Sequence, residues 1–249
     1  MTAIIVGRLP KANFIVADSM VQLDLKVKSH KECRVQDKIT DIELSEQFLV
    51  LVGEQLVADG ANILHYWSTI RKIKYDLFQT ATFEIVLEFA LRYRRYHIDV
   101  AKSPIINQPQ TDVYVASRHG IKYYGVEFKN AKYIVNQEQD IPENYIIINY
   151  KGNLKRIPTP TSDIDILGFS KEQLENEHQY RKLQGFKKGE FPLGYDFDNR
   201  FSSAIIPTDS ALPIQREYPF TFPTDIFLAY RPCWDYVTAP NFRYSPPAM

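Results

Sequence analysis

The residue with the clearest capacity for chemistry is Thr2, which follows an initiator Met1. If Met1 is removed, one residue carries a hydroxyl nucleophile together with a free amine that can act as its base. An α-amine has a pKa of about 7.7 to 8.0, so a useful fraction of it is neutral near physiological pH. The apolar run 2–7 begins at this residue and predicts a short strand. The sequence therefore places a candidate nucleophile at the start of a strand, on the condition that Met1 is removed.

Three other residues stand at the ends of predicted elements. Asp18 closes a second predicted strand, 13–18. Lys38 precedes an apolar segment, and Gly53 separates the predicted strand 48–52 from a helical pattern. Asp18 and Lys38 also have purely structural interpretations, as a turn residue and as a charge on a sheet edge.

A buried cation close to the Thr2 hydroxyl would favour the alkoxide that attacks a substrate. A carboxylate within hydrogen-bonding reach would keep that cation charged against the cost of desolvation. Asp18 is a carboxylate at a predicted strand end, and Lys31, Arg34 and Lys38 are basic residues in the segment that follows it. The choice among the three cations stays open at this point.

This order of residues resembles the proteasome β-subunit family and its bacterial relative, the HslV-type protease, which are N-terminal nucleophile (Ntn) hydrolases. In that family a mature N-terminal Thr starts a strand, an Asp-Ser pair ends the next strand, a Lys precedes an apolar strand, and a Gly closes a strand before a helix. The resemblance implies that Thr2 is the nucleophile and that Lys38 lowers the pKa of its hydroxyl. It further implies that Asp18 orients the Lys and that the backbone N–H of Gly53 stabilises an oxyanion.

The resemblance is weaker after residue 150. A later Asp and Ser pair of the family corresponds to Asp198 with Ser202 or Ser203 in this chain. Residues 149–152 replace the Gly-Ser-Gly turn of the family, whose Ser helps to position the amine. These departures favour an alternative in which the chain is a catalytically inactive, self-assembling structural protein on the same scaffold.

The predicted elements follow the order strands, two helices, strands, which is typical of an α+β fold. The resemblance implies a four-layer αββα sandwich of the Ntn-hydrolase type. A third helix is expected at 170–184, where Ser170 and Gln173 would form a capping box. The two central helices are expected at 54–74 and 76–97, and strands at 112–116, 123–128, 131–136 and 145–150.

The composition of the chain changes near residue 206. Residues 1–206 are expected to form the Ntn-hydrolase-like domain. Residues 207–249 are rich in proline and aromatic side chains, which disfavours both helix and central strand. The apolar content of this segment is too high for a free disordered tail. It is therefore expected to be an extension or arm that packs on the domain or on a neighbouring subunit.

A hairpin in the middle of the chain supports an alternative of another class. Asp112, Glu127 and Lys129 stand at the spacing of the PD-(D/E)xK nuclease motif. In that motif two carboxylates hold Mg²⁺ and the Lys assists the attacking water. A solvated cross-strand pair of Glu127 and Lys129 is the structural interpretation of the same residues.

Charge and composition restrict the remaining classes. The chain has 249 residues with 30 basic and 30 acidic side chains, so its formal net charge is zero. This balance disfavours binding to nucleic acid or to a membrane surface, both of which require a basic excess. The two cysteines lie far apart in the sequence, and no segment resembles a signal peptide, so a reducing, cytoplasmic location is expected. The five histidines lack metal-ligand spacing, and neither a metal nor another cofactor is expected.

The resemblance also implies partners. It implies a homo-oligomer that acts on a peptide or protein substrate. The sequence has no nucleotide-binding loop, so any ATP dependence would come from a separate unfoldase.

Overall fold

A computed structural model describes most of the chain. The described residues are 3–18, 20–23, 32–35, 37–42, 46–71, 82–103, 105, 110–150, 153–159, 165–183, 201–218, 228 and 230–239. They divide into two compact units, each of which is discontinuous in sequence. The first comprises Met1–Ile39, Arg118–Ile121 and Ile141–Phe220, and the second comprises Thr40–Ser117, Lys122–Asp140 and Thr221–Met249.

The first unit contains a six-stranded sheet in which the paired strands run antiparallel. Its strand order is β11-β10-β1-β2-β12-β13. A separate two-stranded sheet is formed by β3 (Met20–Leu23) and β4 (Glu32–Val35). The strands of the large sheet are β1 (Ala3–Arg8), β2 (Ala12–Asp18), β10 (Tyr145–Tyr150), β11 (Asn153–Pro158), β12 (Phe201–Pro207) and β13 (Gln215–Glu217).

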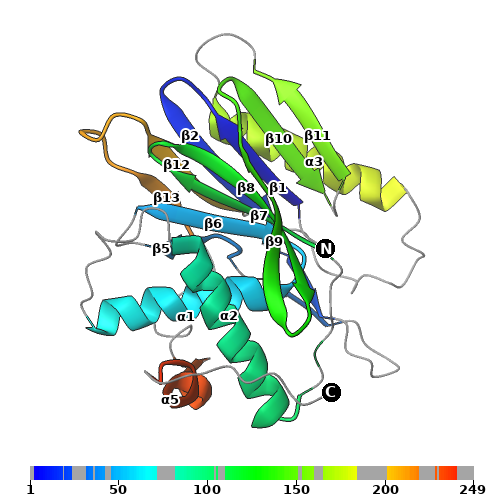
Figure 1. Cartoon of the computed structure of the whole chain (residues 1–249). Coiled ribbons are helices and arrows are strands. Elements are labelled where there is room, and N and C mark those ends of the chain that lie inside the picture. The colour runs from blue at the N-terminus through cyan, green and yellow to red at the C-terminus, as the bar shows by residue number, and fades with distance from the viewer. Residues whose placement is uncertain are drawn as a thin grey trace. The chain divides into compact units, whose positions relative to one another are not determined.

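The central strands β1 and β2 are buried along both faces, because their sequences are almost continuously apolar. Helix α3 (Ile166–Leu183) covers one face of the sheet (Figure 1). Three apolar side chains of this helix pack against residues of β1, β2 and β10. The packed set is Ile166, Phe169 and Leu174 from the helix, with Ile5, Phe14, Val16, Ile146 and Ile148 from the strands.

Helix α3 begins four residues earlier than the sequence predicts. Its N-terminus is capped by Asp165, whose Oδ1 accepts a hydrogen bond from the backbone N–H of Gly168 at 3.0 Å. Ser170 lies inside the helix and is fully buried, so the capping box predicted for Ser170 and Gln173 is wrong. The apolar residues Ile166 and Phe169 pack on the sheet and extend the helix towards its N-terminus.

The second unit combines a five-stranded sheet with two long helices (Figure 1). The strand order is β5-β6-β7-β8-β9. The strands are β5 (Thr40–Ile42), β6 (Gln47–Val52), β7 (Thr111–Ser117), β8 (Gly120–Lys129) and β9 (Lys132–Asp140). The helices are α1 (Gln55–Arg71) and α2 (Thr82–Asp99), followed near the end of the chain by η2 (Arg231–Cys233) and α5 (Trp234–Val237).

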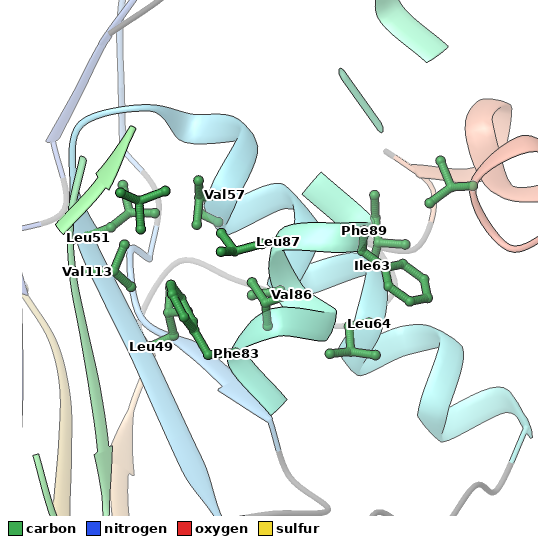
Figure 2. Close-up of a cluster of buried hydrophobic side chains, with 14 of the residues drawn as sticks. Leu49, Leu51, Val57, Ile63, Leu64, Phe83, Val86, Leu87, Phe89 and Val113 are labelled. Carbon is green, nitrogen blue, oxygen red and sulfur yellow. The ribbon is translucent and has the colours of Figure 1, made fainter. Parts of the chain in front are cut away.

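The core of the second unit lies between β6, β7 and the two long helices (Figure 2). Leu49, Leu51 and Val113 from the strands meet Val57 and Leu87 from the helices. The two helices lie close together at Gly60. A Cβ atom added at Gly60 would lie 2.5 Å from the backbone nitrogen of Ala90 and 2.6 Å from the carbonyl oxygen of Val86. The absence of a side chain at Gly60 is therefore required for this helix contact.

The C-terminal part of the chain contributes to the same core. Tyr230, Cys233 and Val237 are buried in it, and the guanidinium of Arg92 on α2 donates hydrogen bonds to the carbonyl oxygens of Val237 and Ala239 at 3.0 and 3.2 Å. The predicted division of the chain into 1–206 and 207–249 stays a prediction.

The expected α+β class is confirmed, with antiparallel sheets and helices in both units. The helices expected at 54–74 and 76–97 appear as α1 and α2. Residues 72–81, where the second was expected to begin, lie outside the described residues. The four-layer order of the expected sandwich stays a prediction. Among the described helices, none combines the length and the apolar composition that a membrane crossing requires.

Candidate functional site

The candidate site of the first unit lies at the end of β2, where one carboxylate oxygen joins two parts of the chain. Oδ1 of Asp18 accepts a hydrogen bond from the backbone N–H of Ala3 at 2.8 Å. The same oxygen accepts a hydrogen bond from Nζ of Lys38 at 2.6 Å. Asp18 follows the last residue of β2 that pairs with β1, because Ala17 lies opposite Ile4. Its side chain therefore takes the place of a backbone acceptor at the start of β1.

The Asp18–Lys38 pair is largely withdrawn from water. The Lys38 side chain is 7% exposed and that of Asp18 is 18% exposed. An ammonium this deeply buried is stable only beside a carboxylate, because the loss of hydration must be compensated by a charge-assisted hydrogen bond. The structure thus brings together two of the predicted site residues, Asp18 and Lys38.

A second contact lies beside this pair. Ser202 on β12 is fully buried, and its Oγ donates a hydrogen bond to Oδ1 of Asp37 at 2.7 Å. Strand β12 pairs with β2, with Phe201 opposite Asp18 and Ser202 opposite Ala17. The sequence predicted Ser202 as a site residue through an Asp and Ser pair, but it gave no reason to select Asp37.

Several predicted residues cannot be placed. Thr2, Lys31 and Asp198 lie outside the described residues. Arg34 lies on β4, of which the structure describes the backbone. The roles that the resemblance assigns to Thr2 and Asp198 stay predictions.

Gly53 belongs to the second unit, between β6 and α1. Its φ of +141° is in the region that L side chains rarely adopt, and an added Cβ would lie 2.7 Å from the Cα of Thr111. The Oγ1 of Thr111 accepts a hydrogen bond from the N–H of Glu54 at 2.9 Å. Glycine is therefore required here for conformation and for space, independently of any role of its N–H group.

The residue after Gly53, Glu54, belongs to a buried polar network of the second unit that could not be predicted from the sequence. Glu54 Oε1 accepts hydrogen bonds from Arg94 at 2.5 Å and from the hydroxyl of Tyr133 at 2.6 Å. The Glu54 and Arg94 side chains are each 4% exposed, and the Arg94 guanidinium lies 3.6 Å from the centre of the Phe128 ring. Burial raises the pKa of the Tyr133 hydroxyl well above its ordinary value, and the Glu54 carboxylate adds to the rise.

A further polar cluster of the second unit joins α1 to the C-terminal segment. The Tyr230 hydroxyl donates a hydrogen bond to Oδ1 of Asp59 at 2.6 Å, and Asn62 donates to the Tyr230 hydroxyl at 3.4 Å. Burial raises the pKa of the Asp59 carboxyl to about 6, and hydrogen bonds from Tyr230 and Gln55 oppose the rise. Burial also raises the pKa of the Cys233 thiol to about 12, so this thiol is protonated at neutral pH and is a weak nucleophile.

The three residues of the nuclease alternative occupy β7 and β8. Asp112 is buried, and its Oδ1 accepts hydrogen bonds from the Tyr123 hydroxyl at 2.9 Å and from Gln110 at 3.2 Å. Glu127 lies four residues beyond Tyr123, which is about 13 Å along a strand, and Lys129 ends β8. Among the described residues, no group of three or more His, Cys, Asp or Glu side chains could hold a metal ion.

Comparisons with known proteins assign no family to the chain. No protein-family model matches the chain, and no curated protein matches it. Among solved structures, the chain is similar to the Anbu (Gly-1) mutant from Hyphomicrobium sp. strain MC1. The match covers 98% of this chain and 100% of that chain, at 12% sequence identity and a TM-score of 0.36.

A structural similarity at this level assigns no family. The interpretation of the chain as a member of the proteasome β-subunit and HslV-type family is wrong, because no family model matches and the structural match is to Anbu at 12% identity. The proposed function of the candidate site therefore rests on the contacts within that site.

Proposed function

We propose that the chain is an amide-bond hydrolase whose nucleophile is the hydroxyl of Thr2, exposed as the first residue by removal of Met1. The observation that supports this proposal is the pair of hydrogen bonds at Asp18 Oδ1. One comes from the N–H of Ala3, and the other comes from Lys38. The Ala3 nitrogen is covalently bonded to the carbonyl carbon of residue 2, so the Cα of residue 2 is about 2.4 Å from it.

The shared oxygen therefore brings a buried cation into the neighbourhood of residue 2. A positive charge there lowers the pKa of the Thr2 ammonium and stabilises the alkoxide that forms during attack. The Asp18 carboxylate keeps Lys38 charged. These are the electrostatic conditions under which a terminal amine can accept the proton of its own hydroxyl at neutral pH.

The reaction proceeds in two halves. The Thr2 amine accepts the hydroxyl proton, the oxygen attacks the amide carbon, and a tetrahedral oxyanion forms. The ammonium then gives its proton to the leaving amine as the C–N bond breaks, which leaves an ester on Thr2. A water molecule, deprotonated by the same amine, hydrolyses this ester and restores the hydroxyl. The donor that the resemblance implies for the oxyanion, the backbone N–H of Gly53, stays a prediction.

Peptides and proteins are the proposed substrates. A closed homo-oligomer and a cytoplasmic location are also expected, and native mass measurement tests the first of these expectations.

The decisive experiment combines mass measurement with covalent labelling. The purified protein should lack Met1 by intact mass, and a peptide epoxyketone should add once, at Thr2, because it requires both the hydroxyl and the amine. Thr2→Ala should remove the adduct and the hydrolysis of a peptide amide, while Thr2→Ser should retain part of both. A chain that keeps Met1, or that hydrolyses peptides equally well after Thr2→Ala, would contradict the proposal. A processed chain that forms no adduct would favour the inactive structural alternative.

A further inference from the structure

Two consecutive side chains, those of Asp37 and Lys38, form hydrogen bonds to two adjacent strands. Asp37 accepts the hydrogen bond of Ser202 on β12, and Lys38 donates to Asp18 at the end of β2. Phe201 and Asp18 are opposite each other in the β2–β12 pair, so the two attachment points lie at the same end of the sheet. The dipeptide 37–38 is therefore held at two points on one rigid element.

We propose that Ser202 and Asp37 are a positioning pair that fixes Lys38 for the reaction, an inference that rests on the proposed function. A lysine has a long side chain with several freely rotating bonds, so its bond to Asp18 constrains the position of the Lys38 backbone only weakly. The Ser202–Asp37 bond removes that freedom one residue away. The hydroxyl of Ser202 thus acts through Asp37 and Lys38, and it makes no contact with the substrate.

The burial of Ser202 supports this role. Ser202 is 0% exposed, so its hydroxyl cannot exchange the Asp37 carboxylate for bulk water without a local opening of the structure. The bond is short at 2.7 Å and joins a neutral donor to an ionisable acceptor, which is the stronger kind of hydrogen bond. The pair therefore has the rigidity that positioning requires.

Loss of this bond has a specific electrostatic consequence. The Lys38 cation lowers the pKa of the Thr2 amine, and this effect weakens when the cation moves away. The amine then holds its proton to a higher pH. The acidic limb of the pH–rate profile, which reports the free amine, should shift upwards without any change in the groups that bind the substrate.

The first test uses the rate of epoxyketone addition to Thr2 in the wild type and in three variants. Ser202→Ala and Asp37→Ala should each lower the maximal rate of addition roughly 10- to 100-fold. The epoxyketone concentration that gives half of the maximal rate should stay within about twofold of the wild-type value. The acidic limb of the Ser202→Ala profile should rise by about half a pH unit or more. The double variant should be no slower than Asp37→Ala, because both substitutions remove the same hydrogen bond between Ser202 and Asp37.

The matched control is Ser170→Ala on α3, which removes another fully buried serine hydroxyl from the same unit. It should leave the rate and the pH profile unchanged. Additive losses in the double variant, or a Ser202→Ala profile that matches the wild type, would overturn the inference.

A second measurement does not depend on the hydrolase activity. Amine acylation followed by peptide mass analysis reports the accessibility of the Lys38 ammonium. Ser202→Ala should increase the acylation rate of Lys38 at least threefold, roughly the change that partial release of a buried amine produces, and Ser170→Ala should not. Increased acylation in a chain that forms no Thr2 adduct supports the positioning pair and contradicts the proposed function. Unchanged acylation in a chain that does form the adduct contradicts the positioning pair alone.

Discussion

Asp18→Ala tests the contact on which the candidate site depends. The substitution removes the carboxylate that accepts hydrogen bonds from Lys38 at 2.6 Å and from the Ala3 N–H at 2.8 Å. Both donors stay in the folded protein, and the Lys38 side chain is only 7% exposed. The variant is therefore expected to fold with a buried ammonium in a much less favourable environment.

The size of the effect follows from the burial of the two partners. Removal of one partner from a fully buried ion pair costs about 3–5 kcal/mol. Asp18 is 18% exposed, so water reaches part of the pair and the lower end of this range applies. Loss of the acceptor for the buried Ala3 amide adds about 1 kcal/mol. The free energy of unfolding should fall by about 4 kcal/mol in total.

Two companion variants separate charge from hydrogen bonding. Asp18→Asn keeps an acceptor oxygen for both donors and loses the charge, so it should cost about 2 kcal/mol. Lys38→Met removes the cation while Asp18 retains the Ala3 amide. Combined with Asp18→Ala, it should restore stability relative to Asp18→Ala alone, because it removes the buried charge that makes the single variant unstable.

Urea unfolding monitored by circular dichroism and tryptophan fluorescence measures these differences. Coincident transitions from the two probes are the control for comparing free energies of unfolding. An Asp18→Ala protein that unfolds at the wild-type urea concentration would refute the reasoning. A double variant that is less stable than Asp18→Ala would refute it equally, because the two side chains would then not be coupled through an unfavourable buried charge.

Three further substitutions test the second unit, and Gly168→Ala in the first unit is the matched control for the first of them. Gly60→Ala should lower the free energy of unfolding by about 2 kcal/mol or more, because backbone atoms obstruct the new Cβ and outweigh a helix-propensity gain of about 1 kcal/mol. Gly168→Ala, where the obstructing group is the Asp165 side chain that caps α3, should lower it by less in the same urea titration, because a lost cap of about 1 kcal/mol is offset by the gain in helix propensity. The pKa of Asp59 rises from 3.8 to about 6 on folding, so between these pH values the folded state binds more protons and stability falls as pH rises. Thermal unfolding should show that Asp59→Asn removes this pH dependence and raises the Tm at pH 7. Arg94→Met should lower the free energy of unfolding by about 3 kcal/mol or more, because it removes the cation beside the buried Glu54 carboxylate and leaves the Tyr133 hydroxyl as a donor. Glu54→Gln in the Arg94→Met background should recover part of this loss, as measured by urea unfolding.

The elements of this fold could be predicted where hydrophobic periodicity was strong. The apolar runs of β1, β2 and β6 and the helical spacing of α1 identify these elements without any tertiary information. The start of α3 could not be identified in the same way. Its first turn is stabilised by packing of Ile166 on the sheet and by Asp165, and packing overrides the local capping signal at Ser170.

Some residues of the site could likewise be predicted from the sequence, and others could not. Asp18 could be selected because it ends a recognisable strand, whereas only the resemblance favoured Lys38 over Lys31 and Arg34. Asp37 could not, because its partner Ser202 is 165 residues away and no periodic pattern links the two positions. The hydrogen bond between Asp59 and Tyr230, which are 171 residues apart, could not be predicted from the sequence for the same reason. Hydrogen bonds between side chains of distant segments depend on strand register and helix packing, which the sequence specifies only through the complete fold.

In the proposed function, removal of Met1 controls the chemistry of the site but not folding, and the contact at Ala3 is consistent with this separation. The described contacts of β1 begin at residue 3: the Ala3 N–H meets Asp18, and Ala3 lies opposite Tyr150 on β10. None of these contacts requires an amine at residue 2. With Met1 attached, the nitrogen of Thr2 is an amide that cannot accept a proton, although Lys38 and Asp18 keep the same bond. The electrostatic part of the proposed site is thus formed by the strand ends, whereas its base appears only when Met1 is removed.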